Sequence, residues 1–166
     1  NFLTSDLLEL KKSEWSKYVS DFNKTLNHKH KGKSPKSLRK SLRREISHRD
    51  SAILGFFKLA SDEDLILLSD LDEIPNPKTI SKAIKKKIDC PQYFKMDWFL
   101  YWINNKVSNP WFGTVLFRFK HIKGNSLDNL RFASPREQDV PGPIISNGGW
   151  HFSYLGGYEA IIYKLK

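Results

Sequence analysis

Residues 64–77 read DLILLSDLDEIPNP, which joins a strand-like run to a dense group of carboxylates. Residues 65–68 form an unalternating apolar run of the kind that a central parallel strand shows. Asp70, Asp72 and Glu73 follow directly after it. This stretch therefore predicts a buried strand that ends in acidic side chains.

Helical patterns flank this strand on both sides. Apolar residues at helical spacing predict a helix over residues 6–19 and one or two helices over residues 35–60. After the acids, Asn76-Pro77 provides an N-cap and a proline at the first helical position. The order helix, strand, acidic turn and helix predicts the α/β fold class.

The second half of the chain has a different composition. Residues 93–103 and 111–122 are rich in aromatic and β-prone side chains, and an asparagine-rich turn separates them. Residues 126–147 contain three prolines and are expected to be mostly irregular. The sequence GGWHFSYLGG at 148–157 predicts a short strand, and a last helix is expected from about Tyr158.

Length and composition predict a single globular domain. The chain has 166 residues, of which 39% are hydrophobic, and no apolar run approaches the roughly 20 residues of a membrane span. It begins at Asn1, so we expect a fragment or a processed form. The single cysteine, Cys90, excludes an internal disulfide and favours a reducing, cytoplasmic compartment.

The formal charge of +10 is concentrated in one segment. Residues 24–44 hold nine Lys and Arg and no acid, so the rest of the chain carries a charge of +1 (10 − 9). This segment is either a solvated surface or a polyanion-binding module. Since it has no Phe, Tyr or Trp for base stacking, no nucleic-acid partner is expected.

Arg49 occupies an unusual position for a charged residue. It lies between Ile46 and Ile53 on the apolar stripe of the predicted helix. Either it pairs with Glu45 one turn earlier, or Arg49 and Asp50 face a ligand site.

Asp70 and Asp72 are two residues apart, so in extended chain they point to the same side. At the carboxyl end of a strand, two such carboxylates form half of a site for Mg²⁺ or Mn²⁺, and substrate phosphates commonly complete such sites. The alternatives are a solvated turn or a phosphohydrolase of the haloacid dehalogenase type, in which the first Asp of D-x-D is the nucleophile.

The sequences LLSDLDEIP at 67–75 and NGGWHFSYLGG at 147–157 together resemble glycosyltransferase family 17, the β-1,4-N-acetylglucosaminyltransferases. Shorter matches are LLEL at 7–10, NKT at 23–25 and HRD at 48–50. The resemblance implies a GT-A type, Rossmann-like nucleotide-sugar domain with a central mixed sheet over residues 1–166, shortened at both ends. It also allows a Golgi lumen location if an N-terminal anchor precedes the chain.

The same resemblance implies a metal-dependent, inverting transfer of a sugar, GlcNAc for preference, from a UDP-sugar to a glycan acceptor. Asp70, Asp72 and His151 would hold Mn²⁺ or Mg²⁺ against the diphosphate. Asp21, Arg49 and Asp50 would contact the nucleotide.

The inverting reaction also needs a carboxylate that takes the proton of the acceptor hydroxyl. The candidates are Asp97, Glu137 and Asp139, with Asp97 favoured because a predicted strand holds it. Glu73 is expected to hydrogen-bond the donor sugar. A stacking platform for the acceptor is expected among four aromatic residues: Trp98, Tyr101, Trp102 and Trp111.

Overall fold

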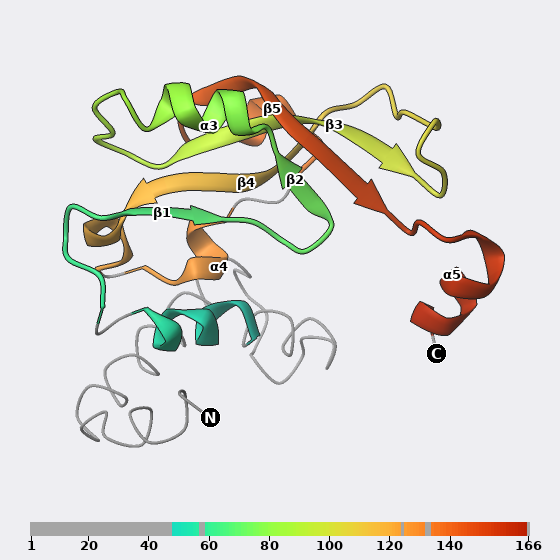
Figure 1. Cartoon of the computed structure of the whole chain (residues 1–166), viewed down its shortest axis with the longest axis horizontal. Helices are drawn as coiled ribbons and strands as arrows, with labels where there is room; N and C mark the ends of the chain where they lie inside the picture. The colour runs from blue at the N-terminus through green and yellow to red at the C-terminus, as the bar shows by residue number, and fades with distance from the viewer. Residues whose placement is uncertain (1–47, 57–58, 124, 132–133, 166) are drawn as a thin grey trace. The chain divides into compact units, whose positions relative to one another are not determined.

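The computed structural model of the chain describes residues 48–56, 59–123, 125–131 and 134–165 (Figure 1). The helix predicted over 6–19, the basic segment 24–44 and Asp21 lie outside these residues. Two compact units are present. The smaller unit contains the described residues up to Asp64 together with residues 119–130, and the larger contains residues 65–118 and those from Arg131 onward. The single domain expected over 1–166 stays a prediction.

The larger unit is built on a mixed five-stranded sheet (Figure 1). The strand order is β1-β4-β3-β5-β2, with β3 parallel to β5 and the other neighbours antiparallel. The expectation of an α/β fold is confirmed at this level. The bounds of its elements are β1 Leu65–Leu68, β2 Glu73–Pro75, α3 Pro77–Ala83, β3 Gln92–Leu100, β4 Trp111–Arg118, β5 Ile144–Ser153 and α5 Gly157–Leu165.

β1 is not the central parallel strand that its apolar run predicts. Among the described strands it lies at an edge of the sheet, antiparallel to β4, and its four residues are half-buried. β4 has the more central place, and its six inner residues, 112–117, are all buried. An apolar run alone does not distinguish these two positions, because both need hydrophobic side chains.

The core of this unit lies between the sheet and α3. Five buried side chains form it: Ala83, Ile88, Phe94, Met96 and Leu116. Burial of each large apolar side chain contributes about 1.5–3 kcal/mol, so this cluster is a major source of the unit's stability. α3 begins as the sequence predicts, because the Asn76 side chain accepts a hydrogen bond from the Lys78 amide (3.0 Å) and proline follows it.

Two predicted strands have different lengths in the structure. β3 stops at Leu100, where Tyr101 takes a positive φ of 67° and turns the chain. β5 has ten residues and begins before the paired glycines, inside the segment expected to be irregular. The glycines allow this pairing because a Cβ on Gly149 would lie 2.2 Å from the Ile74 carbonyl oxygen on β2. Among the described residues of 126–143, the regular structure comprises two short helical turns, Leu127–Leu130 and Glu137–Asp139, and an isolated antiparallel bridge between Ser134 and Phe112.

The described part of the smaller unit contains short helical segments. They are the 3₁₀ turns Ala52–Gly55 and Phe119–Ile122, and α4, Leu127–Leu130. Phe56 and Phe119 pack edge to face with ring centroids 6.1 Å apart. Among the residues that the structure describes, no helix combines the length and the hydropathy needed to cross a membrane.

Candidate functional site

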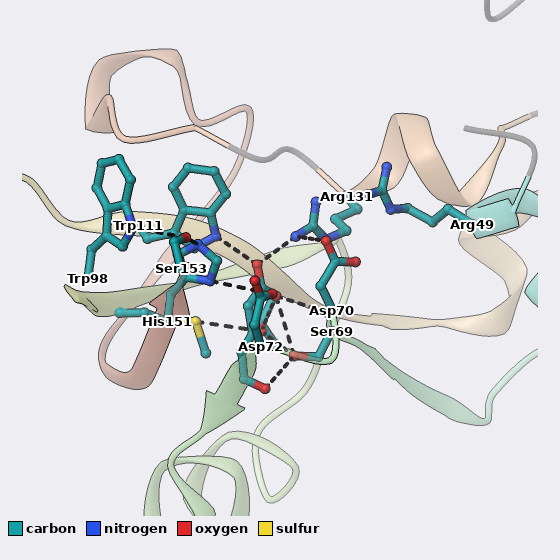
Figure 2. A network of polar contacts seen from close by, with 12 residues as sticks. Arg49, Ser69, Asp70, Asp72, Trp98, Trp111, Arg131, His151 and Ser153 are labelled. Atoms are coloured by element: carbon teal, nitrogen blue, oxygen red, sulfur yellow. Dashed lines mark hydrogen bonds and ion pairs between the residues drawn. The ribbon is translucent and has the colours of Figure 1, made fainter. Parts of the chain in front are cut away.

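The pairing of β2 with β5 brings the two distinctive motifs of the sequence together (Figure 2). Glu73 lies opposite His151 in this antiparallel pair, and the Phe152 amide donates to the Asp72 carbonyl oxygen (2.8 Å). Side chains that are about eighty positions apart in sequence therefore share one edge of the sheet. This adjacency defines the candidate site.

Glu73 is the buried centre of a hydrogen-bond network, and its side chain is 0% exposed. Its Oε1 accepts from Trp111 Nε1 (2.7 Å) and Arg131 Nη2 (2.6 Å), and its Oε2 accepts from Thr114 Oγ1 (3.0 Å) and the Asp70 amide (3.1 Å). A longer contact from Ser69 Oγ (3.4 Å) also reaches Oε2, so protein donors take up the acceptor capacity of this carboxylate. The structure does not support the expected contact of Glu73 with a donor sugar, because the carboxylate is enclosed by protein groups.

Arg131 is the cation of this network, and neither it nor Thr114 belongs to any motif of the sequence. Its side chain is 2% exposed, and Nη2 lies 2.7 Å from Asp70 Oδ2 as well as 2.6 Å from Glu73 Oε1. Arg131 thus ties the acidic turn to the buried carboxylate of Glu73. No local sequence pattern marks it, because its partners are about sixty positions earlier in the chain.

Asp70 and Asp72 lie in a turn and not in extended chain. β1 ends at Leu68, and the Glu73 amide donates to the Asp70 carbonyl oxygen (3.0 Å) to close the turn. The two aspartate side chains are each a little over one-third exposed. Both side chains therefore reach solvent because they lie in a turn, and not because side chains alternate along an extended strand.

His151 is buried beside Asp72. Its ring stacks on Trp111 with centroids 4.5 Å apart, and Ser153 Oγ lies 2.7 Å from its Nε2. Nδ1 has no hydrogen-bond partner and lies 3.7 Å from Asp72 Oδ1. Burial lowers the pKa of His151, against the opposing effect of the nearby Asp72 carboxylate, so the neutral imidazole is favoured at neutral pH.

Ser153, His151 and Asp72 are arranged in space like the nucleophile, base and acid of a catalytic triad, with His151 between the other two. Ser153 is buried, however, and its Oγ also lies 3.3 Å from the indole Nε1 of Trp98. The gap of 3.7 Å between His151 and Asp72 exceeds a hydrogen bond. We therefore interpret the contacts as ones that orient the imidazole, with Nδ1 directed at Asp72. They do not present Ser153 as a nucleophile.

Asp72 and His151 are two side chains at this edge that could hold a divalent cation. Within the described ranges, no group of three or more His, Cys, Asp or Glu side chains is arranged to hold a metal ion. Asp72 and His151 would be the residues to hold such an ion, since Oδ1 and Nδ1 lie 3.7 Å apart and a carboxylate and an imidazole are both acceptable ligands; the ion would supply Lewis-acid stabilisation of negative charge. Mg²⁺ and Mn²⁺ typically take one or two carboxylates and complete the shell with phosphate and water oxygens.

Arg49 and Asp50 have protein partners in the smaller unit. Arg49 Nη1 forms an ion pair with Asp128, and Asp50 Oδ1 accepts from the Asp128 amide (2.9 Å). Asp50 is 1% exposed, and burial raises its pKa to about 6. These contacts account for a charged residue on an apolar stripe. The alternative partner Glu45 lies outside the described residues.

Asp97 is not brought to the candidate site. It lies opposite Trp150 on β5, whereas the next pair, Trp98 and His151, faces the other side of the sheet. Its carboxylate is exposed and lies 2.7 Å from Lys106 Nζ. Glu137 pairs with Lys95 (2.6 Å) in the same way, so the geometry selects neither carboxylate as a proton acceptor.

The four aromatic residues of the expected platform separate into two pairs. Trp98 and Trp111 are half-buried, have ring centroids 5.3 Å apart and form the wall around His151. Tyr101 and Trp102 are exposed beyond the end of β3.

A scan against protein-family models and searches of curated proteins and of solved structures gave no match.

Proposed function

We propose that the chain is a metal-dependent glycosyltransferase of the inverting type, with a GT-A-like fold and a UDP-sugar, UDP-GlcNAc for preference, as donor. The observation that carries the proposal is the adjacency of Asp72 and His151 across the β2–β5 pair. Both motifs that resemble family 17 contribute to this one edge. A neutral imidazole and a partly exposed carboxylate are a suitable pair of ligands for Mn²⁺ beside a diphosphate.

In the proposed reaction an acceptor hydroxyl oxygen bonds to the anomeric carbon of the donor sugar. The bond from that carbon to the diphosphate breaks, UDP leaves with the electron pair, and the hydroxyl proton passes to a base. A bound divalent cation would stabilise the negative charge of the departing UDP. Asp72 and His151 would hold the cation, and Arg131 and Glu73 fix the turn that presents Asp72.

The two alternatives make different demands on the chain. A phosphohydrolase needs the Asp70 carboxylate as a nucleophile, but Asp70 Oδ2 is engaged by Arg131 at 2.7 Å. A polyanion-binding module would use the basic segment 24–44, which lies outside the described residues. We therefore keep both as outcomes of the experiment.

Isothermal titration calorimetry with UDP tests the proposal. We expect UDP to bind the full chain in the presence of Mn²⁺, and we expect binding to be lost with EDTA or in Asp72→Ala. Asp89→Ala is the matched control, because Asp89 is an exposed carboxylate in a surface ion pair with Lys87 (3.2 Å). Release of UDP from UDP-GlcNAc in the presence of neutral glycans then reads the transfer itself.

UDP binding that persists without a divalent cation, or that is unchanged in Asp72→Ala, would contradict the proposal. Hydrolysis of para-nitrophenyl phosphate that disappears in Asp70→Asn would favour the phosphohydrolase. Heparin binding that needs Lys36, Arg39, Lys40 and Arg43, together with no response to UDP, would favour the polyanion-binding module.

A further inference from the structure

An exposed group of aromatic and aliphatic side chains lies beyond the ends of the two parallel strands β3 and β5. Trp102 is 61% exposed, although it is one of the largest side chains in the chain. Large exposed apolar groups of this kind mark interaction sites more often than isolated surface residues do. We name it the aromatic patch, and its members are Tyr101, Trp102, Ile103, Tyr154, Leu155 and Tyr158.

The backbone under the aromatic patch is held by hydrogen bonds. The Tyr101 amide donates to the Ser153 carbonyl oxygen (3.0 Å), and the Asn105 amide donates to the Trp102 carbonyl oxygen (3.1 Å). Tyr101 and Tyr154 both have positive φ values, 67° and 57°, and their ring centroids are 6.3 Å apart. Bulky residues rarely adopt this conformation, so the surrounding contacts keep the two rings side by side at the strand ends.

The aromatic patch lies a short distance along the chain from the candidate site on both strands. Tyr154 follows His151 by three residues, which corresponds to about 10 Å along extended chain. On the neighbouring strand, Tyr101 follows Trp98 by the same number of residues, and Trp98 lies opposite His151. A ligand of two or three sugar rings therefore has the length to reach from the patch to the candidate site.

The chemistry of the aromatic patch favours an uncharged ligand with both polar and apolar surface. The segments YWINN at 101–105 and YLGGY at 154–158 contain no charged residue, in a chain whose formal charge is +10. The electron-rich faces of Tyr and Trp rings attract the C–H bonds on the flat face of a pyranose. Hydroxyl groups and the exposed amide of Asn104 can hydrogen-bond the sugar's edges.

We propose that the aromatic patch binds a neutral oligosaccharide, which places the acceptor of the proposed transferase at the ends of β3 and β5. The identity of the acceptor end rests on the proposed function, but the binding of sugar at the patch does not. Binding there requires neither UDP nor a divalent cation. The two proposals can therefore fail separately.

Saturation-transfer NMR on the full chain, without nucleotide or metal, tests this inference with three neutral probes: triacetylchitotriose, mannotriose and galactotriose. We expect transfer to at least one trisaccharide, and we expect Trp102→Ala to weaken its binding by about three- to tenfold. Tyr158→Ala, which also removes an exposed side chain of the patch, is expected to weaken trisaccharide binding as well. Tyr163→Ala removes an exposed tyrosine that is not a member of the patch and should leave binding unchanged.

The inference is overturned if no trisaccharide binds, or if Trp102→Ala and Tyr163→Ala behave alike. Self-association by analytical ultracentrifugation that is lost in Trp102→Ala would assign the patch to a second copy of the chain instead. Binding to phosphatidylcholine vesicles that depends on Trp102 would assign it to a lipid surface. Mn²⁺-dependent UDP binding measured on Trp102→Ala separates failure of this inference from failure of the proposed function.

Discussion

At the scale of single residues, one acidic turn joins two partly exposed carboxylates, Asp70 and Asp72, to the buried carboxylate of Glu73. Asp70 and Asp72 stood out because two carboxylates close together after an apolar run are unusual. Glu73 looked similar to them but is enclosed by Trp111, Thr114 and Arg131. Local sequence could not separate these roles, because exposure is set by residues that arrive from distant parts of the chain.

Glu73→Gln is expected to destabilise the protein by about 2–4 kcal/mol, because it leaves the buried Arg131 guanidinium with a weaker partner. Denaturant unfolding monitored by circular dichroism measures the change. Glu137→Gln, which removes a carboxylate from an exposed ion pair with Lys95, should change stability by less than about 1 kcal/mol. Equal effects of the two substitutions would contradict the role given to the Glu73 network.

At the scale of elements, local signals located the beginnings of helices and the presence of strands. The Asn76-Pro77 cap and the start of the last helix near Tyr158 are confirmed. Strand ends and sheet positions were predicted less well. β5 extends through glycines that look like a strand boundary, because β3 at Gly148 and β2 at Gly149 approach too closely for a Cβ.

Gly149→Ala is expected to disrupt the β2–β5 pair. A Cβ there would lie 2.2 Å from the Ile74 carbonyl oxygen and 2.8 Å from the Pro75 Cα, and φ is +134°. We expect a loss of about 1–3 kcal/mol in stability, together with loss of the Asp72–His151 adjacency and of Mn²⁺-dependent UDP binding. Differential scanning fluorimetry and calorimetry measure the two effects.

Gly55→Ala is the control for this substitution, because nothing lies within 4 Å of the added Cβ. The melting temperature of Gly55→Ala should lie within about a degree or two of that of the unchanged chain, because most surface substitutions have small effects on stability. A Gly149→Ala protein with unchanged melting would show that the pair tolerates a side chain and that the adjacency does not depend on this glycine.

At the scale of the whole molecule, the pH dependence of stability combines opposing contributions. Burial raises the pKa of Asp50 to about 6 from 3.8, so the folded state holds this proton more tightly and stability falls as pH rises between about 4 and 6. Burial lowers the pKa of His151, so the folded state binds this proton less tightly than the unfolded state. The stability of the protein therefore falls as pH drops below 6.5, the ordinary pKa of histidine.

Asp50→Asn should therefore stabilise the protein at pH 7.5 by up to about 3 kcal/mol, because it removes a buried charge while its side-chain oxygen can still accept from the Asp128 amide. The gain should shrink toward zero near pH 4. Urea unfolding across this pH range measures the profile, with the exposed Asp62→Asn as control. A gain that does not vary with pH would show that the effect is not caused by ionisation.

The sequence by itself determined the α/β class, the helix start at Asn76-Pro77 and the acidic residues that the candidate site presents, because these follow from periodicity, capping and residue type within short windows. Only the tertiary structure decided that β1 is an edge strand among the described strands, that Glu73 is buried and that Arg131 holds the acidic turn. It also decided that Asp72 and His151 are neighbours. These features depend on strand pairing between distant segments, and pairing is selected by the packing of the whole sheet rather than by any single stretch of sequence.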